Sequence, residues 1–340
     1  MNRPTFFEHL HPPFIPEAQA RFRYTLGLGG LSVFFFLVTS VSGALLLFYY
    51  SPTAAQANAS VQLLQFHVPL GWLVRGVHFW SAQALVVTAA LHLLRVALTG
   101  GFRSGRRFNW LLGLGLLFIV LALDFTGYGL RWDASIGWAL VVGTNLMRLV
   151  PLAGETLYRW AVGGSALGEA TVLRLFGWHV FGLMLPAFAV LIWHLFRVRR
   201  DGGIAHPAGP QGVGDSRLPR ARLVRREVMA MLLAGALLLT LTAAAAPALT
   251  GPFDPSSPIA EARAPWFFLS LQELLRLGDP LWMGVFVPLV ALALVALLPY
   301  GIDRGLILGR WLPRDGRVGQ ALVLTIAVGA CLLAVRGALR

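Results

Sequence analysis

Seven long apolar stretches constrain the fold of this 340-residue chain more than any other feature of its sequence. A helix needs about 20 mostly apolar residues to cross the hydrocarbon core of a bilayer. Only 13% of the residues are charged and 57% are hydrophobic, whereas soluble domains carry about 25% charged residues. The expected fold class is therefore all-α, a polytopic membrane protein with seven transmembrane helices. The stretches are Tyr24–Tyr50, Trp72–Leu94, Trp110–Leu130, Leu175–Phe196, Val228–Leu249, Pro280–Tyr300 and Val318–Val335.

The arginines predict how these spans are oriented. All 28 basic residues are arginine, and the formal charge is +13. With the N-terminus in the cytoplasm, the cytoplasmic segments hold 19 arginines and 7 acids, and the opposite side holds 9 arginines and 7 acids, with Asp124 left out because it lies inside a span. This positive-inside asymmetry predicts a bacterial-type cytoplasmic membrane protein with its C-terminus outside. The positive charge then sets the orientation of the spans and contacts anionic membrane lipid, and no nucleic-acid partner is expected.

Polar segments divide the chain into two parts. Residues 1–200 carry four spans, residues 201–226 form an arginine-rich cytoplasmic linker, and residues 227–340 carry three spans. Two long outward connections contain apolar stretches, Trp138–Pro151 and Pro265–Leu277, which are predicted to be surface helices. Long structured loops often carry function. The first 23 residues are polar and contain prolines, so no cleaved signal peptide is expected.

Four of the eight histidines lie inside predicted spans, in two pairs of similar spacing. His78 and His92 are 14 apart in the second span, and His179 and His194 are 15 apart in the fourth. A helix rises roughly 21–22 Å over these spacings and completes nearly whole turns, so each pair lies on one helix face. Both spans run from outside to inside. His78 is therefore expected opposite His179 at the outer level, and His92 opposite His194 at the inner level.

Two histidines that meet across a gap between helices suit axial ligation of haem iron. A single intramembrane histidine is more often a satisfied core residue, but two matched pairs favour two non-covalent haem b groups. The sole cysteine, Cys331, excludes an internal disulfide and a cysteine-ligated cluster held by this chain alone.

Glycines and arginines provide a second, independent pattern. The glycine pairs of the first and third spans have the same spacing as His78 and His92, which predicts clearance for a flat macrocycle at each level, although small residues also serve ordinary helix packing. Arginines near the histidines are candidate partners of the haem propionates, or simply anchors at the membrane interface. The residues in question are Gly29, Gly43, Gly113 and Gly127 for clearance, and Arg75 and Arg106 for the propionates.

Two segments carry a resemblance to a known family. Gly71–Arg107 and the TGYGLRWDASIGWAL segment, Thr126–Leu140, closely resemble the cytochrome b subunit of the cytochrome bc complexes. The unequal spacings of the two histidine pairs are those of the chloroplast-type bf branch. The last three spans resemble the separate three-helix subunit of bf complexes, here fused to the four-helix dihaem bundle.

The resemblance implies a respiratory quinol-oxidising complex. A quinol would be oxidised at an outer site, passing one electron to a Rieske iron–sulfur protein and one through the two b haems to quinone at an inner site. A c-type cytochrome or similar acceptor and a homodimer are the expected partners. The matching outer-site residues are Tyr128, Gly143, Trp266 and Phe267.

Two departures from the family pattern affect the expected chemistry. Where the family commonly has a Pro-Glu-Trp-Tyr motif, this chain has Ala264, Pro265, Trp266 and Phe267, so the proton-accepting glutamate is absent. Glu273 and Asp124 are the candidate substitutes, because a carboxylate in a low-dielectric site can exchange protons near neutrality. Glu273 could equally lie on the solvated face of a surface helix.

The second departure concerns the inner side. The cysteine that attaches an extra haem in bf complexes is replaced by Gly27, so no covalent third haem is expected.

Two other functions remain open at this point. A dihaem membrane anchor could exchange electrons between quinone and a different redox module without splitting the electron pair. A proton-coupled transporter could use the histidines as a relay. The long outer loops and the GYGLRWD segment favour the quinol-oxidising complex, because a simple anchor needs neither.

Overall fold

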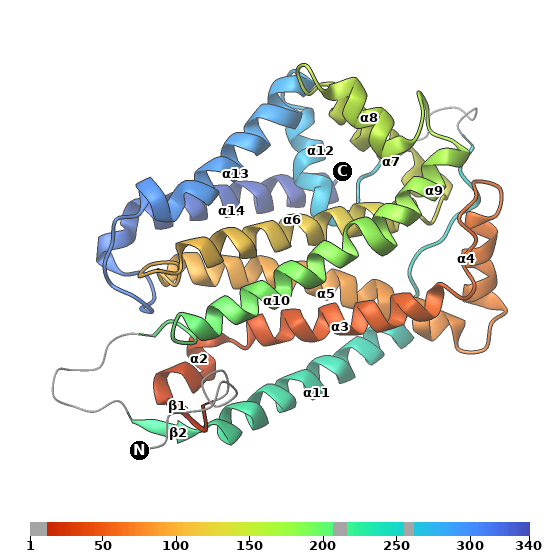
Figure 1. The fold of residues 1–340 in the computed structure, drawn as a ribbon. Coiled ribbons are helices and arrows are strands. Elements are labelled where there is room, and N and C mark those ends of the chain that lie inside the picture. Colours follow the sequence, from red (N-terminus) through yellow and green to blue (C-terminus); the bar gives the residue numbers. More distant parts are fainter. Residues whose placement is uncertain (1–11, 207–215, 255–261) are drawn as a thin grey trace.

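The computed structural model describes residues 12–206, 216–254 and 262–340, and it contains seven helices long and apolar enough to cross a membrane (Figure 1). Each coincides with a predicted stretch, so the all-α polytopic fold is confirmed. The fourth and sixth spans are compound helices that include short π-helical turns. The spans are α3 (Leu28–Leu46), α5 (Gly71–Leu98), α6 (Arg107–Gly129), α9 to α10 (Glu169–Arg200), α11 (Arg220–Ala244), η4 to η5 (Trp282–Ile302) and η6 to α14 (Arg314–Ala338).

Helices α3, α5, α6 and α10 (Met184–Arg200) form the central bundle, and α11 lies along α3 and α5 (Figure 1). Aromatic and branched side chains pack in part of the space between them, because a helix that is apolar on every face buries that surface against its neighbours or lipid. The buried core of this bundle consists of Phe35, Phe36, Leu85, Val86, Val120, Ala187 and Leu238.

The end of the bundle that the arginine asymmetry predicts to face outward, called the outer end here, carries several short helices, and the opposite end is called the inner end. Helices α4 (Ala57–Phe66), α7 (Ala134–Arg148), α8 (Gly154–Val162) and α9 (Glu169–Gly177) lie at the right-hand end of Figure 1. The predicted surface helix Trp138–Pro151 corresponds to α7, which begins earlier because the Asp133 side chain accepts from the Ile136 backbone N–H at 3.1 Å.

The second predicted surface helix, Pro265–Leu277, corresponds to the 3-10 turn η3 (Trp266–Phe268) and to α12 (Leu269–Leu275). The short helices α4 and α8 were not predicted from the sequence.

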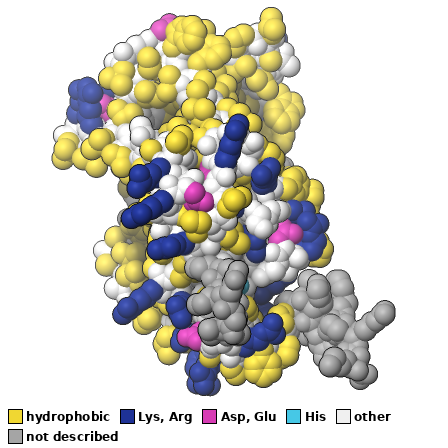
Figure 2. All heavy atoms as spheres, turned by 90° about the vertical axis from the view of Figure 1, so that its left-hand side faces the viewer, with side chains coloured by type: hydrophobic (Ala, Val, Ile, Leu, Met, Phe, Trp, Pro, Cys, Tyr) yellow, Lys and Arg dark blue, Asp and Glu magenta, His cyan; other side chains and the backbone are white. Residues whose placement is uncertain are grey.

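The inner end is smaller and basic. Strand β1 (Phe14–Pro16) pairs with β2 (Arg217–Pro219) in an antiparallel ribbon, followed by η1 (Glu17–Ala20) and α2 (Phe22–Thr25). The stretch predicted as a linker therefore contains a strand and the start of α11. Figure 2 shows this end of the molecule, with many arginines and few acidic side chains. Residues 1–11, within the segment considered for a signal peptide, lie outside the described part.

A buried ion-pair network joins the two halves at the inner end. The Arg103 guanidinium, from the turn between α5 and α6, binds both carboxylate oxygens of Asp303 at 2.7 and 2.9 Å and Asp315 at 3.0 Å. Arg103 and Asp303 are 4% and 2% exposed. The Trp110 indole also donates to the Val295 carbonyl at 2.9 Å. The three-helix part is therefore held against the bundle by specific polar contacts as well as by apolar packing.

Candidate functional site

The outer histidines lie across from each other between α5 and the start of the fourth span. The ring centroids of His78 and His179 are 6.3 Å apart. Metal–imidazole bonds are about 2.0 Å long, so one metal ion separates two ligating nitrogens by about 4 Å and two ring centroids by roughly 6 Å. The spacing of these two rings matches a metal ion held between them.

Hydrogen bonds orient both outer rings. The Nδ1 atom of His78 lies 3.0 Å from the Thr39 carbonyl, and that of His179 lies 3.0 Å from the Leu123 carbonyl. A hydroxyl also approaches each Nδ1, from Ser42 at 3.3 Å and from Thr126 at 3.1 Å. When Nδ1–H donates to a carbonyl, Nε2 is left with a free lone pair for a metal.

The inner histidines have a similar arrangement with weaker hydrogen bonding. His92 lies close enough to His194 to interact with it electrostatically. The Asn109 carbonyl is the backbone group that His194 faces, although its Nδ1 falls outside hydrogen-bond geometry. The carbonyls of Thr39, Leu123 and Asn109 all precede one of the four glycines by four residues.

Each of the four glycines lies against one histidine ring. A Cβ atom added to Gly43 would lie 2.9 Å from Cε1 of His78, and one on Gly127 would lie 2.8 Å from Cε1 of His179. The inner distances are 3.1 Å for Gly29 and His92, and 3.3 Å for Gly113 and His194. The missing side chains let each imidazole approach the helix backbone. The equal spacing of the glycines therefore matches, in the first place, the space that the imidazole rings occupy.

A π-helical turn accounts for the unequal histidine spacings. Residues Trp178–Gly182, which include His179, form the π-helical turn η2 between α9 and α10. No such turn interrupts α5 between His78 and His92. A π turn inserts one residue into an α-helix, so the longer spacing in the fourth span covers the same number of turns as the shorter spacing in α5.

The outer histidines line a cavity of about 530 Å³. Its walls come from α3, α5, α6 and the fourth span and are mostly apolar, with Phe36, Leu85, Val120 and Phe188 among them. Cofactor sites usually measure about 300–1,000 Å³ and carry few polar groups. The cavity volume, the opposed imidazoles and the glycine clearance together fit a haem b group.

The residues expected at the outer quinol site form a connected aromatic group. The ring of Tyr128 lies 5.6 Å from that of Phe267, and Trp266 donates from its indole nitrogen to Gln83 Oε1 at 2.6 Å. Gly143 on α7 contacts this group indirectly: a Cβ there would lie 2.8 Å from the Phe125 ring, which packs against Phe268. Tyr128 and Gln83 also line the cavity, so the aromatic group borders the histidine site.

The two candidate proton acceptors lie in different surroundings. Asp124 is 8% exposed, lines the cavity, and has a buried Oδ2 without a hydrogen-bond partner. Glu273 is 2% exposed and is not on the solvated face considered above. It lies between α12 and α14, where Arg276 directly after α12, Arg336 on α14 and Arg340 beyond it approach its carboxylate to 3.3, 3.2 and 3.7 Å. Oε2 of Glu273 is also buried without a hydrogen-bond partner, but two arginine side chains lie within 4 Å of it, so the geometry favours Asp124.

The candidate propionate partners also differ from each other. Arg75 lines the outer cavity but donates to the Gln65 side chain and to the carbonyls of Pro247 and Ala248. Arg106 donates to the Asp201 carbonyl at 2.6 Å and keeps a buried Nε without a partner. Burial lowers the pKa of Arg106, an effect that the nearby Asp201 opposes.

Sequence reasoning missed Arg95. It is 6% exposed, lies three residues after His92, stacks over the Tyr24 ring at 4.2 Å, and has a buried Nη2 without a partner. Its position three residues from a histidine of the pattern is the signal that could have identified it.

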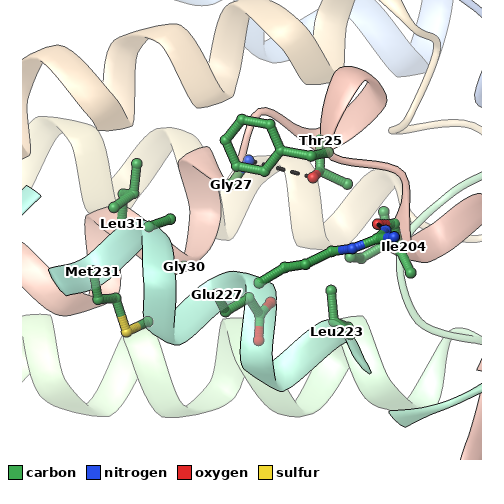
Figure 3. A pocket seen from close by; sticks show the side chains of 12 residues that line it. Thr25, Gly27, Gly30, Leu31, Ile204, Leu223, Glu227 and Met231 are labelled. Carbon is green, nitrogen blue, oxygen red and sulfur yellow. Dashed lines mark hydrogen bonds between the residues drawn. The ribbon is translucent and has the colours of Figure 1, made fainter. Parts of the chain in front are cut away.

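A smaller hollow of about 20 Å³ lies at the inner end, between the start of α3 and the first part of α11 (Figure 3). Gly27, Gly30 and Leu31 line one side, and Glu227 and Met231 line the other. Gly27 precedes α3 with φ +63°, a left-handed conformation that glycine adopts without strain. Its backbone N–H donates to the Thr25 hydroxyl at 3.3 Å.

Known proteins resemble this chain along most of its length. A sequence profile of the family described as Cytochrome b/b6/petB matches residues 17–202. Cytochrome b6 of Synechococcus elongatus is 37% identical over 175 residues, which cover 52% of this chain and 81% of that protein. Cytochrome b6 of Oltmannsiellopsis viridis shows the same identity and coverage.

The fold likeness extends further along the chain. A solved structure described as "Hyperthermophilic respiratory Complex III" superposes with a TM-score of 0.82 over 93% of this chain and 84% of the other, at 22% identity. The chain therefore belongs to the cytochrome b/b6 family, the multi-pass, haem b-carrying membrane cytochromes of bc-type quinol oxidoreductase complexes.

Proposed function

We propose that this cytochrome b is the dihaem core of a quinol-oxidising complex that divides the two electrons of a quinol. The observation that carries the proposal is the outer cavity, in which an opposed histidine pair adjoins an aromatic group that includes Tyr128 and Phe267. His78 and His179 would hold one haem b, and His92 and His194 the other. Haem b supplies one-electron exchange at both levels, so an electron released outside can reach the inner side.

The residues of this chain have distinct parts in the proposed function. The carbonyls of Thr39 and Leu123 keep the outer imidazoles oriented, and the four glycines admit the rings. Tyr128, Gly143, Trp266 and Phe267 would bind a quinol headgroup beside the outer cavity. Arg75, Arg95 and Arg106 would compensate the propionate charges.

Quinone reduction would take place at the inner end of the bundle, near His92 and His194, and outside the hollow shown in Figure 3, whose volume of about 20 Å³ is too small for a quinone headgroup. Gly27 offers no side chain for covalent attachment there, and no covalent third haem is part of the proposal.

The proposed partners follow from this reaction. A Rieske iron–sulfur protein would take one electron at the outer side, and a c-type cytochrome or similar acceptor would receive it. The arginine-rich end would face the cytoplasm, with the C-terminus outside, and two copies would form a dimer. Residues 1–200 and 227–340 would act as two parts joined through residues 201–226.

The experiment that tests this function starts from the purified complex. A pyridine haemochrome assay should find two haem b groups per chain, a Rieske protein should copurify, and quinol should reduce haem b. With the inner site blocked, an oxidant for the iron–sulfur partner should increase haem b reduction, because both electrons must leave the quinol together. An unbranched anchor would instead become more oxidised, and a transporter would contain no haem b.

A further inference from the structure

We infer that Asp124 is the group that accepts a quinol proton at the outer site. The inference rests on the proposed function, because it assigns a step of quinol oxidation. In the family pattern a glutamate stands where this chain has Pro265, so the proton needs another acceptor.

The placement of Asp124 supports this role. It occupies the helix turn before Tyr128, and both residues line the cavity that holds His78 and His179. Its side chain is 8% exposed, and Oδ2 has no hydrogen-bond partner. A buried polar atom without a partner is costly, so its retention calls for a ligand, a water molecule or a catalytic role.

Asp124 is the only carboxylate that lines this cavity among the described residues. The other titratable or charged groups on its walls cannot serve equally well, because the imidazoles are assigned to haem and the guanidinium groups and tyrosine hydroxyls already carry their protons. These groups are Tyr50, Arg75, His78, Tyr128, Arg131 and His179.

The neighbouring charges leave Asp124 free for this role. Arg131, at the outer end of α6, is paired with Asp133, and Arg75 is held by Gln65 and two backbone carbonyls. The other candidate, Glu273, is surrounded by three arginines outside the cavity.

Oxidation of a quinol to a quinone breaks two O–H bonds and removes two electrons. One proton forms a new O–H bond on the Asp124 carboxylate, and the other leaves on the side of the iron–sulfur protein. The two electrons would go to two one-electron acceptors, the iron–sulfur partner and the haem b that His78 and His179 would hold.

Asp124→Asn in the assembled complex tests the inference, because it removes the base while it preserves size. A positioned general base contributes about 10²–10⁴-fold to a rate. We expect kcat for quinol oxidation to fall roughly 100-fold, with KM changed less than threefold and the haem b content unchanged. An exposed outer carboxylate, Glu155, provides the matched control: Glu155→Gln should keep the rate of the unaltered complex.

A rescue variant separates proton acceptance from a structural role. Pro265→Glu places a carboxylate at the position where the family carries one, and the Pro265 carbonyl that accepts from Phe268 N–H at 2.8 Å is retained. The double variant Asp124→Asn/Pro265→Glu should have a kcat for quinol oxidation at least tenfold higher than that of Asp124→Asn. Redox infrared difference spectra should also lose one carboxylic acid C=O band in Asp124→Asn and keep it in Glu155→Gln.

The possible failures are distinguishable. If the unaltered complex oxidises quinol and Asp124→Asn does so at the same kcat, the inference is wrong and the proposed function stands. The inference is also wrong, and the proposed function stands, if Glu273→Gln lowers kcat with an unchanged haem b content and Asp124→Asn does not. If the unaltered complex oxidises no quinol, the proposed function and this inference both fall.

Discussion

The outer and inner ends of the bundle share one arrangement, a histidine pair with a glycine against each ring, but the contacts are closer at the outer end. At the outer end, added Cβ atoms would lie 2.8–2.9 Å from the histidine rings, and a carbonyl and a hydroxyl approach each Nδ1. At the inner end the corresponding Cβ distances are 3.1–3.3 Å, and His194 Nδ1 lacks hydrogen-bond geometry.

The surroundings of the two levels differ as well. The outer level opens into a cavity of about 530 Å³ beside aromatic rings and an unpartnered carboxylate. The inner level is near arginines with unpartnered nitrogens and a hollow of about 20 Å³. The comparison indicates that the same histidine and glycine pattern occurs at both levels, with closer contacts at the outer level, and that the outer level also adjoins a cavity with room for a substrate.

The largest expected effect comes from removing one ligand at either level. His179→Ala should reduce the haem b content from two to one per chain and eliminate quinol-driven haem reduction. His194→Ala should also leave one haem b, which quinol can still reduce, because the outer level is intact. For each variant, a haemochrome assay measures the haem b content and a spectrum recorded after addition of quinol measures haem reduction. Two haem groups in either variant would contradict the assigned ligands.

The next largest effect concerns the junction of the two halves, which is buried at the inner end. Asp303→Asn leaves the buried Arg103 guanidinium without its bidentate partner. Breaking a buried pair costs about 3–5 kcal/mol. Thermal unfolding in detergent should therefore occur at a clearly lower temperature. Glu155→Gln breaks exposed outer ion pairs worth about 0–1 kcal/mol and is the control; equal effects would contradict the comparison.

The smallest expected effect comes from single methyl groups at the glycines. Gly127→Ala should destabilise the complex by about 1–3 kcal/mol through overpacking and weaken retention of the outer haem. Gly113→Ala, with 3.3 Å available, should cost less. Gly115, on the same helix with nothing within 4 Å, provides the control Gly115→Ala. Haem retention during thermal unfolding measures all three, and the order Gly127, Gly113, Gly115 is the expected ranking.

Much of the architecture could be predicted because its signals are local. Each span is a run of apolar residues, and each histidine or glycine pair is a spacing within one helix. The short helices α4 and α8 were missed although α8 is amphipathic, because helices of 10 and 9 residues are far shorter than the apolar runs that identify spans. The strand β2 was missed because its partner β1 lies far away in the chain, before the first span.

The sequence by itself determined the seven spans, their arginine asymmetry and the levels of the four histidines, because length, charge and helical spacing act along the chain. The tertiary structure alone decided which carboxylate is free. Asp124 and Glu273 are both buried acids, and no local pattern distinguishes them. Only the approach of α14 to α12 brings Arg336 and Arg340 to Glu273, while Asp124 is left facing the outer cavity. Pairing of charges depends on side chains that meet across helices, which a single sequence does not display.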